Sequence, residues 1–155
     1  MPPLRFEPLN AQHIPAILEI ENASQGAPWS ERAFLNELTH PHSIFRVAFH
    51  QRDLVAYGGI WTIVDEAHVT TLTVAPDRRK LGFGEALMIE LLAESIRAGM
   101  TCSTLEVRAG NLPAIKLYEK LGYKTIATRK RYYPDNQEDA LVMWLYHLDT
   151  WKVPV

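Results

Sequence analysis

Arg78-Arg79-Lys80-Leu81-Gly82-Phe83-Gly84 is the stretch of sequence that decides the fold, because it joins a predicted strand to a predicted long helix. The strand before it covers residues 67–74, and the helix after it keeps apolar residues at helical spacing until about Gly99. The first N–H groups of a helix lack intrahelical partners and carry partial positive charge, so this arrangement is typical of a phosphate-binding loop. Gly82 and Gly84 would let a phosphate approach the backbone, and the three cations add local positive charge. Taken alone, such a turn is also typical of an ordinary solvated helix start.

Two familiar phosphate loops are excluded. A P-loop requires a Gly-Lys-Ser/Thr sequence, which the run does not contain. A dinucleotide-binding loop requires a third glycine where Leu87 stands, and it follows the first parallel strand of its fold. Here the glycines come after three strands that are predicted to be antiparallel.

The hydrophobic pattern on both sides of the run predicts a mixed sheet with helices. Upstream, it predicts a strand at 4–8, helices at 10–22 and 30–40, and antiparallel strands at 44–50, 54–63 and 67–74. Downstream, it predicts a strand at 104–108, a helix at 111–120, and closing strands at 123–128 and 140–146. We therefore predict an α/β (α+β) fold with a mixed sheet of about seven strands and about four helices.

Size, charge and composition exclude several classes of protein. With 155 residues, the chain is expected to form one domain with a hydrophobic core. A formal net charge of −2, and no aromatic residues among the clustered cations, argue against binding to nucleic acid or to an anionic membrane. No apolar stretch approaches the roughly 20 residues that span a bilayer, and the N-terminus lacks the core of a signal peptide. A cytoplasmic setting is expected.

Neither the cysteine nor the histidines predict a metal site. The single cysteine, Cys102, can form no internal disulfide and is expected to be a quiet buried thiol. The histidines show no metal-ligand spacing beyond His40-Pro41-His42, and loop histidines after a helix are common.

The pattern Arg79-x-x-Gly82-x-Gly84 resembles the coenzyme A pyrophosphate loop of the GCN5-related N-acetyltransferase (GNAT) superfamily. Four further blocks, in the same order, are similar to the RimI type of that superfamily. They are Ala27-Pro28-Trp29-Ser30-Glu31, Leu105-Glu106-Val107-Arg108-Ala109, Asn111-x-x-Ala114-Ile115-x-Leu117-Tyr118, and Arg129-x-x-Tyr132-Tyr133-Pro134 with Glu138-Asp139-Ala140. The resemblance runs from Leu4 to about Leu148 and departs from many relatives at Gly110. It implies one GNAT domain over residues 1–155, with a C-terminal extension at 149–155 of no assigned role.

This resemblance implies an enzyme that moves an acetyl group from acetyl-coenzyme A, without a metal, to the N-terminal alanine of a small-subunit ribosomal protein. The strand before the basic run would bind the pantetheine arm through its backbone, and an amide near its end would polarise the thioester carbonyl. The residues expected to contact the coenzyme are Leu72, Thr73, Val74, Arg79, Lys80, Leu81, Gly82, Phe83, Gly84, Glu85 and Asn111.

Acetyl transfer to an amine needs a neutral amine and a protonated leaving sulfur. An α-amino group with a pKa near 8 is about 10% neutral at pH 7, whereas a lysine is far less so, and a general base still helps. Glu106 interrupts the apolar run Leu105-Glu106-Val107 of a central strand, so partial burial is expected to raise its pKa. The alternative is an exposed glutamate that pairs with Arg108. The resemblance favours Glu106 as the base.

Tyr118 is the candidate acid, because a phenol stays protonated at neutral pH and can donate to the departing thiolate. A helix tyrosine is more often a packed core residue, and it is the resemblance that favours the catalytic role. Asn111, two helical turns earlier, is expected to cap the helix, and the resemblance implies that it also contacts coenzyme A.

The acceptor is expected to lie between two loops that carry Trp29, Tyr132, Tyr133, Glu138 and Asp139. The acidic residues could hold a cationic N-terminus and the aromatic ones could wall a narrow slot; simple packing of the two loops is the alternative. Other functions also stay open. The chain could acetylate a broader set of N-termini, lysines or small amines, or it could bind coenzyme A without catalysis. The oligomeric state is not predicted.

Overall fold

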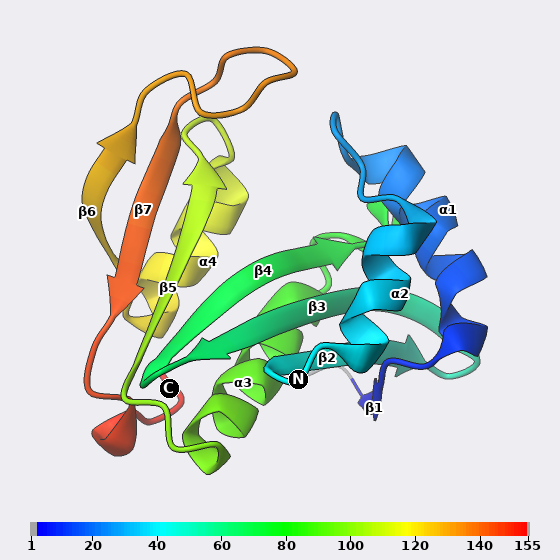
Figure 1. The fold of residues 1–155 in the computed structure, drawn as a ribbon, viewed down its shortest axis with the longest axis horizontal. Helices are drawn as coiled ribbons and strands as arrows, with labels where there is room; N and C mark the ends of the chain where they lie inside the picture. The colour runs from blue at the N-terminus through cyan, green and yellow to red at the C-terminus, as the bar shows by residue number, and fades with distance from the viewer. Residues whose placement is uncertain (1–2, 155) are drawn as a thin grey trace.

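The computed structural model describes residues 3–154, which form one seven-stranded sheet covered by helices on both faces (Figure 1). The sheet order is β1-β2-β3-β4-β5-β7-β6. Its strands are β1 (Leu4–Pro8), β2 (Ser43–His50), β3 (Asp53–Ile63), β4 (Glu66–Val74), β5 (Cys102–Arg108), β6 (Lys124–Arg129) and β7 (Ala140–Leu145). All neighbours are antiparallel except β4 and β5, so the predicted mixed, mostly antiparallel fold is confirmed.

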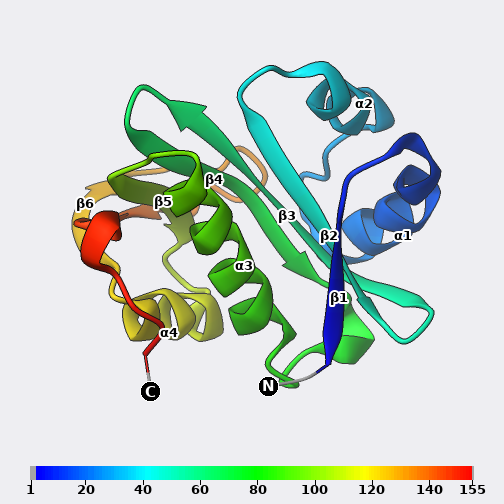
Figure 2. The same cartoon turned by 90° about the horizontal axis from the view of Figure 1, so that it is seen from below.

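The four α-helices begin in different ways, and a polar side chain caps two of them. They are α1 (Ile14–Ser24), α2 (Glu31–Thr39), α3 (Phe83–Arg97) and α4 (Leu112–Leu121), and three short 3-10 turns lie at Ala11–His13, Pro76–Arg78 and Leu148–Thr150. Ser30 accepts a hydrogen bond from the N–H of Ala33 at 3.2 Å, which caps α2. Figure 2 shows α1 and α2 on one face of the sheet and α3 and α4 on the other.

Two apolar clusters fill the two faces. Leu87 and Leu91 of α3 pack against strand residues such as Ile60, and all three side chains are fully buried. On the opposite face, Ile17 and Phe34 of α1 and α2 pack in a second cluster around β2 and β3. Burial of such side chains stabilises the fold by about 1.5–3 kcal/mol each.

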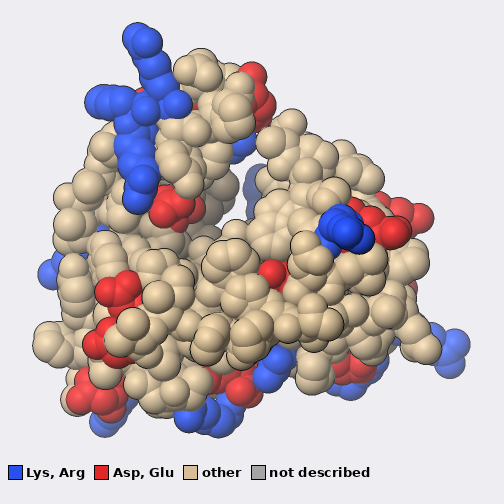
Figure 3. Space-filling view, in the orientation of Figure 1, with Lys and Arg blue, Asp and Glu red and all other residues tan. Residues whose placement is uncertain are grey.

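The strands β4 and β5 separate along their length, and this separation positions the candidate site. They pair in parallel only where Glu66–His68 meets Cys102–Thr104. Just beyond, Thr70 has no partner in the register between β3 and β4, since Gly59 pairs with Thr71 and Ile60 with Val69. Such a bulge bends and twists its strand. The remaining halves of β4 and β5 diverge and leave a gap between them (Figure 1). The surface of the molecule is hollowed at this gap (Figure 3).

The C-terminal residues pack onto the core. Leu148 is fully buried and its N–H donates to the Thr101 carbonyl at 2.9 Å. The Trp151 indole N–H donates to the Leu121 carbonyl, at the end of α4, at 2.8 Å. The tail, which the sequence left without a role, thus ties the end of β7 to α4. No helix within residues 3–154 is both long and apolar enough to cross a lipid bilayer.

Candidate active site

The basic run lies at the open end of β4 and leads directly into α3. Gly82 is the cap of α3 with φ 84°, a left-handed conformation that favours glycine, and no side chain caps the helix. The N–H groups of the first turn therefore stay available to an anion. Phe83 is buried and anchors the turn, while Arg79 and Lys80 are exposed beside it. The predicted loop and helix N-terminus are thus present, and the binding of a phosphate there stays a prediction.

Gly84, in the first turn of α3, has room for a side chain. A Cβ at this position would lie 3.5 Å from Val74 Cγ2 and 3.6 Å from Leu117 Cδ2, which are ordinary contacts. Packing within the protein therefore does not require glycine here, and close approach of a ligand to the backbone would explain it. Beside it, Glu85 forms an ion pair of 2.6 Å with Lys120, which joins the start of α3 to α4.

The edge of β4 that faces the gap is free of strand pairing after His68. Leu72 turns its side chain into the core cluster, and Thr73 is buried with its hydroxyl accepting a hydrogen bond of 3.1 Å from Gln25 Nε2. The Arg79 Nε–H donates to the Val74 carbonyl at 3.3 Å. An unpaired strand edge beside a helix N-terminus fits a ligand with an amide-bearing arm and a pyrophosphate, as coenzyme A has.

Glu106 lies on β5, opposite Val142 of β7, on the other side of the gap. Its side chain is exposed, so the expected partial burial is wrong: the divergence of β4 removes the neighbour that would cover it. Its expected alternative partner is also wrong, because Arg108 binds other carboxylates. Instead, the Tyr132 hydroxyl donates to Glu106 Oε2 at 2.9 Å and orients the carboxylate. This bond, with burial, raises the pKa of Tyr132.

Tyr118 lies on α4 within the core cluster and is 7% exposed. Its ring packs edge-on against Tyr123, with ring centroids 5.7 Å apart. Burial, and then the nearby Tyr133, raise the pKa of Tyr118 above that of a free phenol. Asn111 caps α4 by accepting a hydrogen bond of 3.3 Å from the N–H of Ala114. The helix thus presents a tyrosine that stays protonated over a wide pH range.

A buried carboxylate, that of Glu21, anchors the loop between α1 and α2. The sequence did not single out this residue. Glu21, 1% exposed, accepts from the Trp29 N–H at 2.8 Å and from the hydroxyl of Tyr57, a fully buried residue of β3. Trp29 itself packs against Phe34, with ring centroids 5.2 Å apart. The only sequence signal of this role is a charged residue within the apolar pattern of α1.

The loop between β6 and β7 carries the other residues predicted at the acceptor site. Tyr132 is exposed and stands edge-on to Tyr133, with ring centroids 5.1 Å apart. The two acidic residues bind within the protein: Glu138 accepts from the Gly110 N–H at 2.8 Å, and Asp139 accepts from the Arg131 N–H at 3.0 Å. These contacts match the alternative expectation, in which Glu138 and Asp139 pack the loop and do not hold the acceptor N-terminus.

Arg108 organises this loop, a role that the sequence did not predict. Its guanidinium lies over the Tyr133 ring at 3.9 Å from the centroid and forms ion pairs with Asp135 at 3.1 Å and Glu138 at 3.3 Å. Partial burial opposes the charged form, but the hydrogen bonds that Arg108 donates to Glu138 and Asp135 outweigh it and raise the pKa of Arg108. An arginine two residues after Glu106 on the same strand was the available signal, but its partners lie far along the chain.

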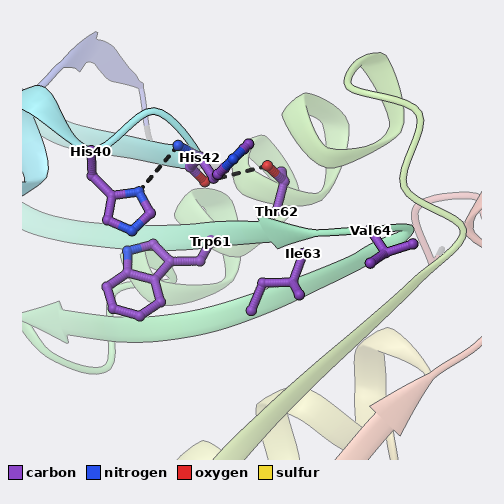
Figure 4. Close-up of a pocket in the computed structure, with 6 residues that line it drawn as sticks. All are labelled: His40, His42, Trp61, Thr62, Ile63 and Val64. Atoms are coloured by element: carbon purple, nitrogen blue, oxygen red, sulfur yellow. Dashed lines mark hydrogen bonds between the residues drawn. The ribbon is translucent and has the colours of Figure 1, made fainter.

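A second hollow lies away from these residues, at the turn between β3 and β4 (Figure 4). There His40 stacks on Trp61 with ring centroids 4.6 Å apart, and its Nδ1 accepts a hydrogen bond from the His42 N–H at 3.1 Å. The histidine pair therefore serves local packing. Among residues 3–154, no group of three or more His, Cys, Asp or Glu side chains is arranged to hold a metal ion. The thiol of Cys102 is half-buried, and burial raises its pKa.

Comparison with known proteins agrees with the geometry. Residues 14–123 match the model of the acetyltransferase (GNAT) family. A Bacillus subtilis (strain 168) protein, provisionally named a ribosomal protein bS18-alanine N-acetyltransferase, is 36% identical and covers 88% of this chain and 91% of itself. The Escherichia coli (strain K12) protein named [ribosomal protein bS18]-alanine N-acetyltransferase is 34% identical, covering 88% of this chain and 93% of the relative.

Solved structures extend the comparison to three dimensions. The crystal structure of the ribosomal-protein-S18-alanine N-acetyltransferase from Escherichia coli superposes with a TM-score of 0.85 at 30% identity, covering 99% of this chain and 96% of that one. Arabidopsis thaliana NAA60 in complex with a bisubstrate analogue shares the fold, with a TM-score of 0.83 at 18% identity, over 93% and 98% of the two chains. The chain therefore belongs to the acetyltransferase (GNAT) family, in its RimI type, and is an acetyl-coenzyme A-dependent N-acetyltransferase.

Proposed function

We propose that this enzyme acetylates the N-terminal alanine of ribosomal protein bS18, with Glu106 as general base and Tyr118 as general acid. The names of its relatives supply the acceptor. The observation that supports the chemical roles is an exposed carboxylate on β5, oriented by the Tyr132 hydroxyl, together with a buried tyrosine on α4.

In the proposed reaction, the α-amine approaches the gap from the face of Glu106. The amine nitrogen forms a bond to the thioester carbonyl carbon, and its proton passes to Glu106, directly or through water. The carbon–sulfur bond then breaks, and the sulfur takes the hydroxyl proton of Tyr118. Free N–H groups on the open edge of β4 would stabilise the charge that develops on the carbonyl oxygen.

Two features of the site support these roles. Glu106 Oε2 is held by Tyr132, and Oε1 has no hydrogen-bond partner within residues 3–154, so it is available to accept a proton. Tyr118 has a raised pKa and remains a proton donor at the pH where the amine is neutral. An α-amine is the easier substrate, because its pKa lies more than two units below that of a lysine.

The first experiment is a mass measurement on three acceptors. We expect the protein with acetyl-coenzyme A to add one acetyl group to the α-amine of a peptide that begins Ala-Arg. The same peptide with a blocked N-terminus and an internal lysine, and a free polyamine, test the broader acceptor range. An unmodified Ala-Arg peptide would contradict the proposed acceptor, while comparable rates on all three would favour a broad-specificity enzyme.

A further inference from the structure

Two loops that are distant in sequence touch at the open end of the gap. Gly26 belongs to the loop between α1 and α2, and Asp135 belongs to the loop between β6 and β7. A Cβ built on Gly26 would collide with Asp135 Oδ2 and lie 3.3 Å from its Cγ, and the atoms nearest to that position all belong to Asp135. Gly26 does not have a left-handed φ, so its backbone would accept alanine. The requirement for glycine comes from the neighbouring loop.

Asp135 is fixed in this place from β5. Its two carboxylate oxygens each accept a hydrogen bond of 3.1 Å from the Arg108 Nη2 group. Both side chains are only 25% exposed, which strengthens a charge-assisted pair relative to one in bulk water. Arg108 also donates to Asn136 Oδ1 at 3.2 Å, so one guanidinium holds the tip of the loop at several points.

The opposite loop is fixed to β4. The Gln25 amide donates to Thr73 Oγ1 at 3.1 Å, directly before Gly26 in the chain. The contacts thus run from Thr73 on β4 through Gln25, Gly26 and Asp135 to Arg108 on β5. At the other end of the gap, the two strands pair through Glu66–His68. The gap between β4 and β5 is therefore bounded at both ends, by strand pairing at one end and by the loop contacts at the other, so that protein surrounds it as a ring. The two strands themselves do not pair beside the gap (Figure 1).

We propose that Arg108 and Asp135 form a clasp that closes this ring and positions the acceptor N-terminus within it. The proposal rests on the proposed function. Arg108 follows Glu106 by two residues, and the clasped loop carries Tyr132, whose hydroxyl holds Glu106. Closing the ring orders the loop before the acceptor arrives, so the acceptor does not have to order it on binding. The start of α3 is built by other elements and does not depend on the clasp.

The test separates acceptor binding from coenzyme binding. Asp135→Ala and Arg108→Gln are each expected to raise the KM for an Ala-Arg peptide about tenfold, the usual effect of losing a charge-assisted hydrogen bond. The KM for acetyl-coenzyme A should stay within about twofold of the wild-type value, since the coenzyme site is untouched. Lys130→Gln is the matched control: it removes an exposed ion pair with Asp139 inside the same loop and should change neither KM.

The contact itself can be tested from the opposite loop. Gly26→Ala should raise the acceptor KM, because the new methyl group pushes Asp135 away. The double variant Gly26→Ala with Asp135→Ala should be no worse than Asp135→Ala alone, since the obstructing carboxylate is then gone. Additive effects of the two changes would show that Gly26 and Asp135 act separately and would overturn the clasp.

A measurement that does not depend on catalysis, amide hydrogen exchange, tests the clasp independently of the proposed function. Amide hydrogen exchange in residues 25–30 and 130–139 should become faster in Asp135→Ala than in the wild type, with exchange in α3 unchanged. If the wild-type protein acetylates no peptide, the proposed function fails, while the exchange result still decides whether the loops are clasped. Unchanged exchange together with an unchanged acceptor KM would overturn the clasp even in an active enzyme.

Discussion

Glu106 and Tyr118 come from two different elements, β5 and α4, and their surroundings suit opposite directions of proton transfer. The carboxylate is exposed and oriented by the Tyr132 hydroxyl at 2.9 Å, as a proton acceptor should be. The tyrosine is buried on α4, and burial favours its neutral, protonated form. Each environment is compatible with the proposed role, and replacement of one residue should leave the other in place.

Glu106→Gln and Tyr118→Phe should each lower kcat by about a hundredfold or more, as expected for the loss of a positioned acid or base. Both changes preserve size, so the dissociation constant of acetyl-coenzyme A, measured by calorimetry, should stay nearly unchanged. Thr101→Ala, at an exposed site just before β5, serves as the control and should keep the wild-type rate. An unaltered rate in both active-site variants would refute the assigned roles.

The pH profile of kcat/KM provides a check on the tyrosine in the same experiment. Its raised pKa means that Tyr118 remains protonated up to and beyond pH 10, so it should cause no fall in rate below that value. The rate should instead rise through the pKa of the amine, near 8, and then level off. A descending limb between pH 8 and about 10 would point to a different acid.

At the scale of elements, the two glycines at the start of α3, Gly82 and Gly84, meet different physical requirements. Gly82 needs a left-handed φ of 84°, whereas Gly84 is helical and has ordinary room for a methyl group. Alanine is a better helix former than glycine. Conformation therefore explains the first glycine, and we propose close approach of the coenzyme as the reason for the second.

Gly84→Ala should leave the melting temperature unchanged or slightly higher, while it raises the KM for acetyl-coenzyme A about tenfold or more. Gly99→Ala is the matched control: φ is 85° and nothing lies within 4 Å, so this change should cost roughly 1 kcal/mol of stability without affecting the coenzyme. Thermal unfolding and steady-state kinetics measure both. If Gly84→Ala bound the coenzyme normally, the pyrophosphate would not approach the backbone at this point.

At the scale of the whole molecule, carboxylates tie the loop between β6 and β7 to the rest of the fold. Hydrogen bonds from the Gly110 N–H and from Arg108 hold the pKa of Glu138 below its ordinary value of 4.5. The Arg131 N–H and Lys130 hold the pKa of Asp139 below its ordinary value of 3.8. A lowered pKa in the folded state means that these groups stabilise the fold above their ordinary pKa values.

The free energy of unfolding should therefore be steady near neutral pH and should fall as the pH drops below about 4.5, because the carboxyl of Glu138 then takes up a proton in the unfolded chain while it stays ionised in the folded protein. Glu138→Gln should make this fall less steep, because the variant has lost one titrating group. Urea unfolding at several pH values measures the slope. An equally steep decrease in the variant would show that Glu138 does not contribute to it.

The sequence by itself determined the elements and the type of binding loop. Strand and helix periods, the polar caps at Ser30 and Asn111, and the glycines of the basic run act over a few neighbouring residues, so they can be seen in the chain alone. The choice of Glu106 and Tyr118 came from family resemblance, and their roles stay predictions.

Only the tertiary structure decided how these pieces meet. The insertion of β7 between β5 and β6, the separation of β4 from β5, the exposure of Glu106 and the partners of Arg108 all depend on contacts between distant segments. Gly26 and Asp135 lie next to each other, although more than a hundred positions separate them in the chain. No local pattern encodes such contacts, because they arise when the strands are ordered and their loops are brought to the same end of the sheet.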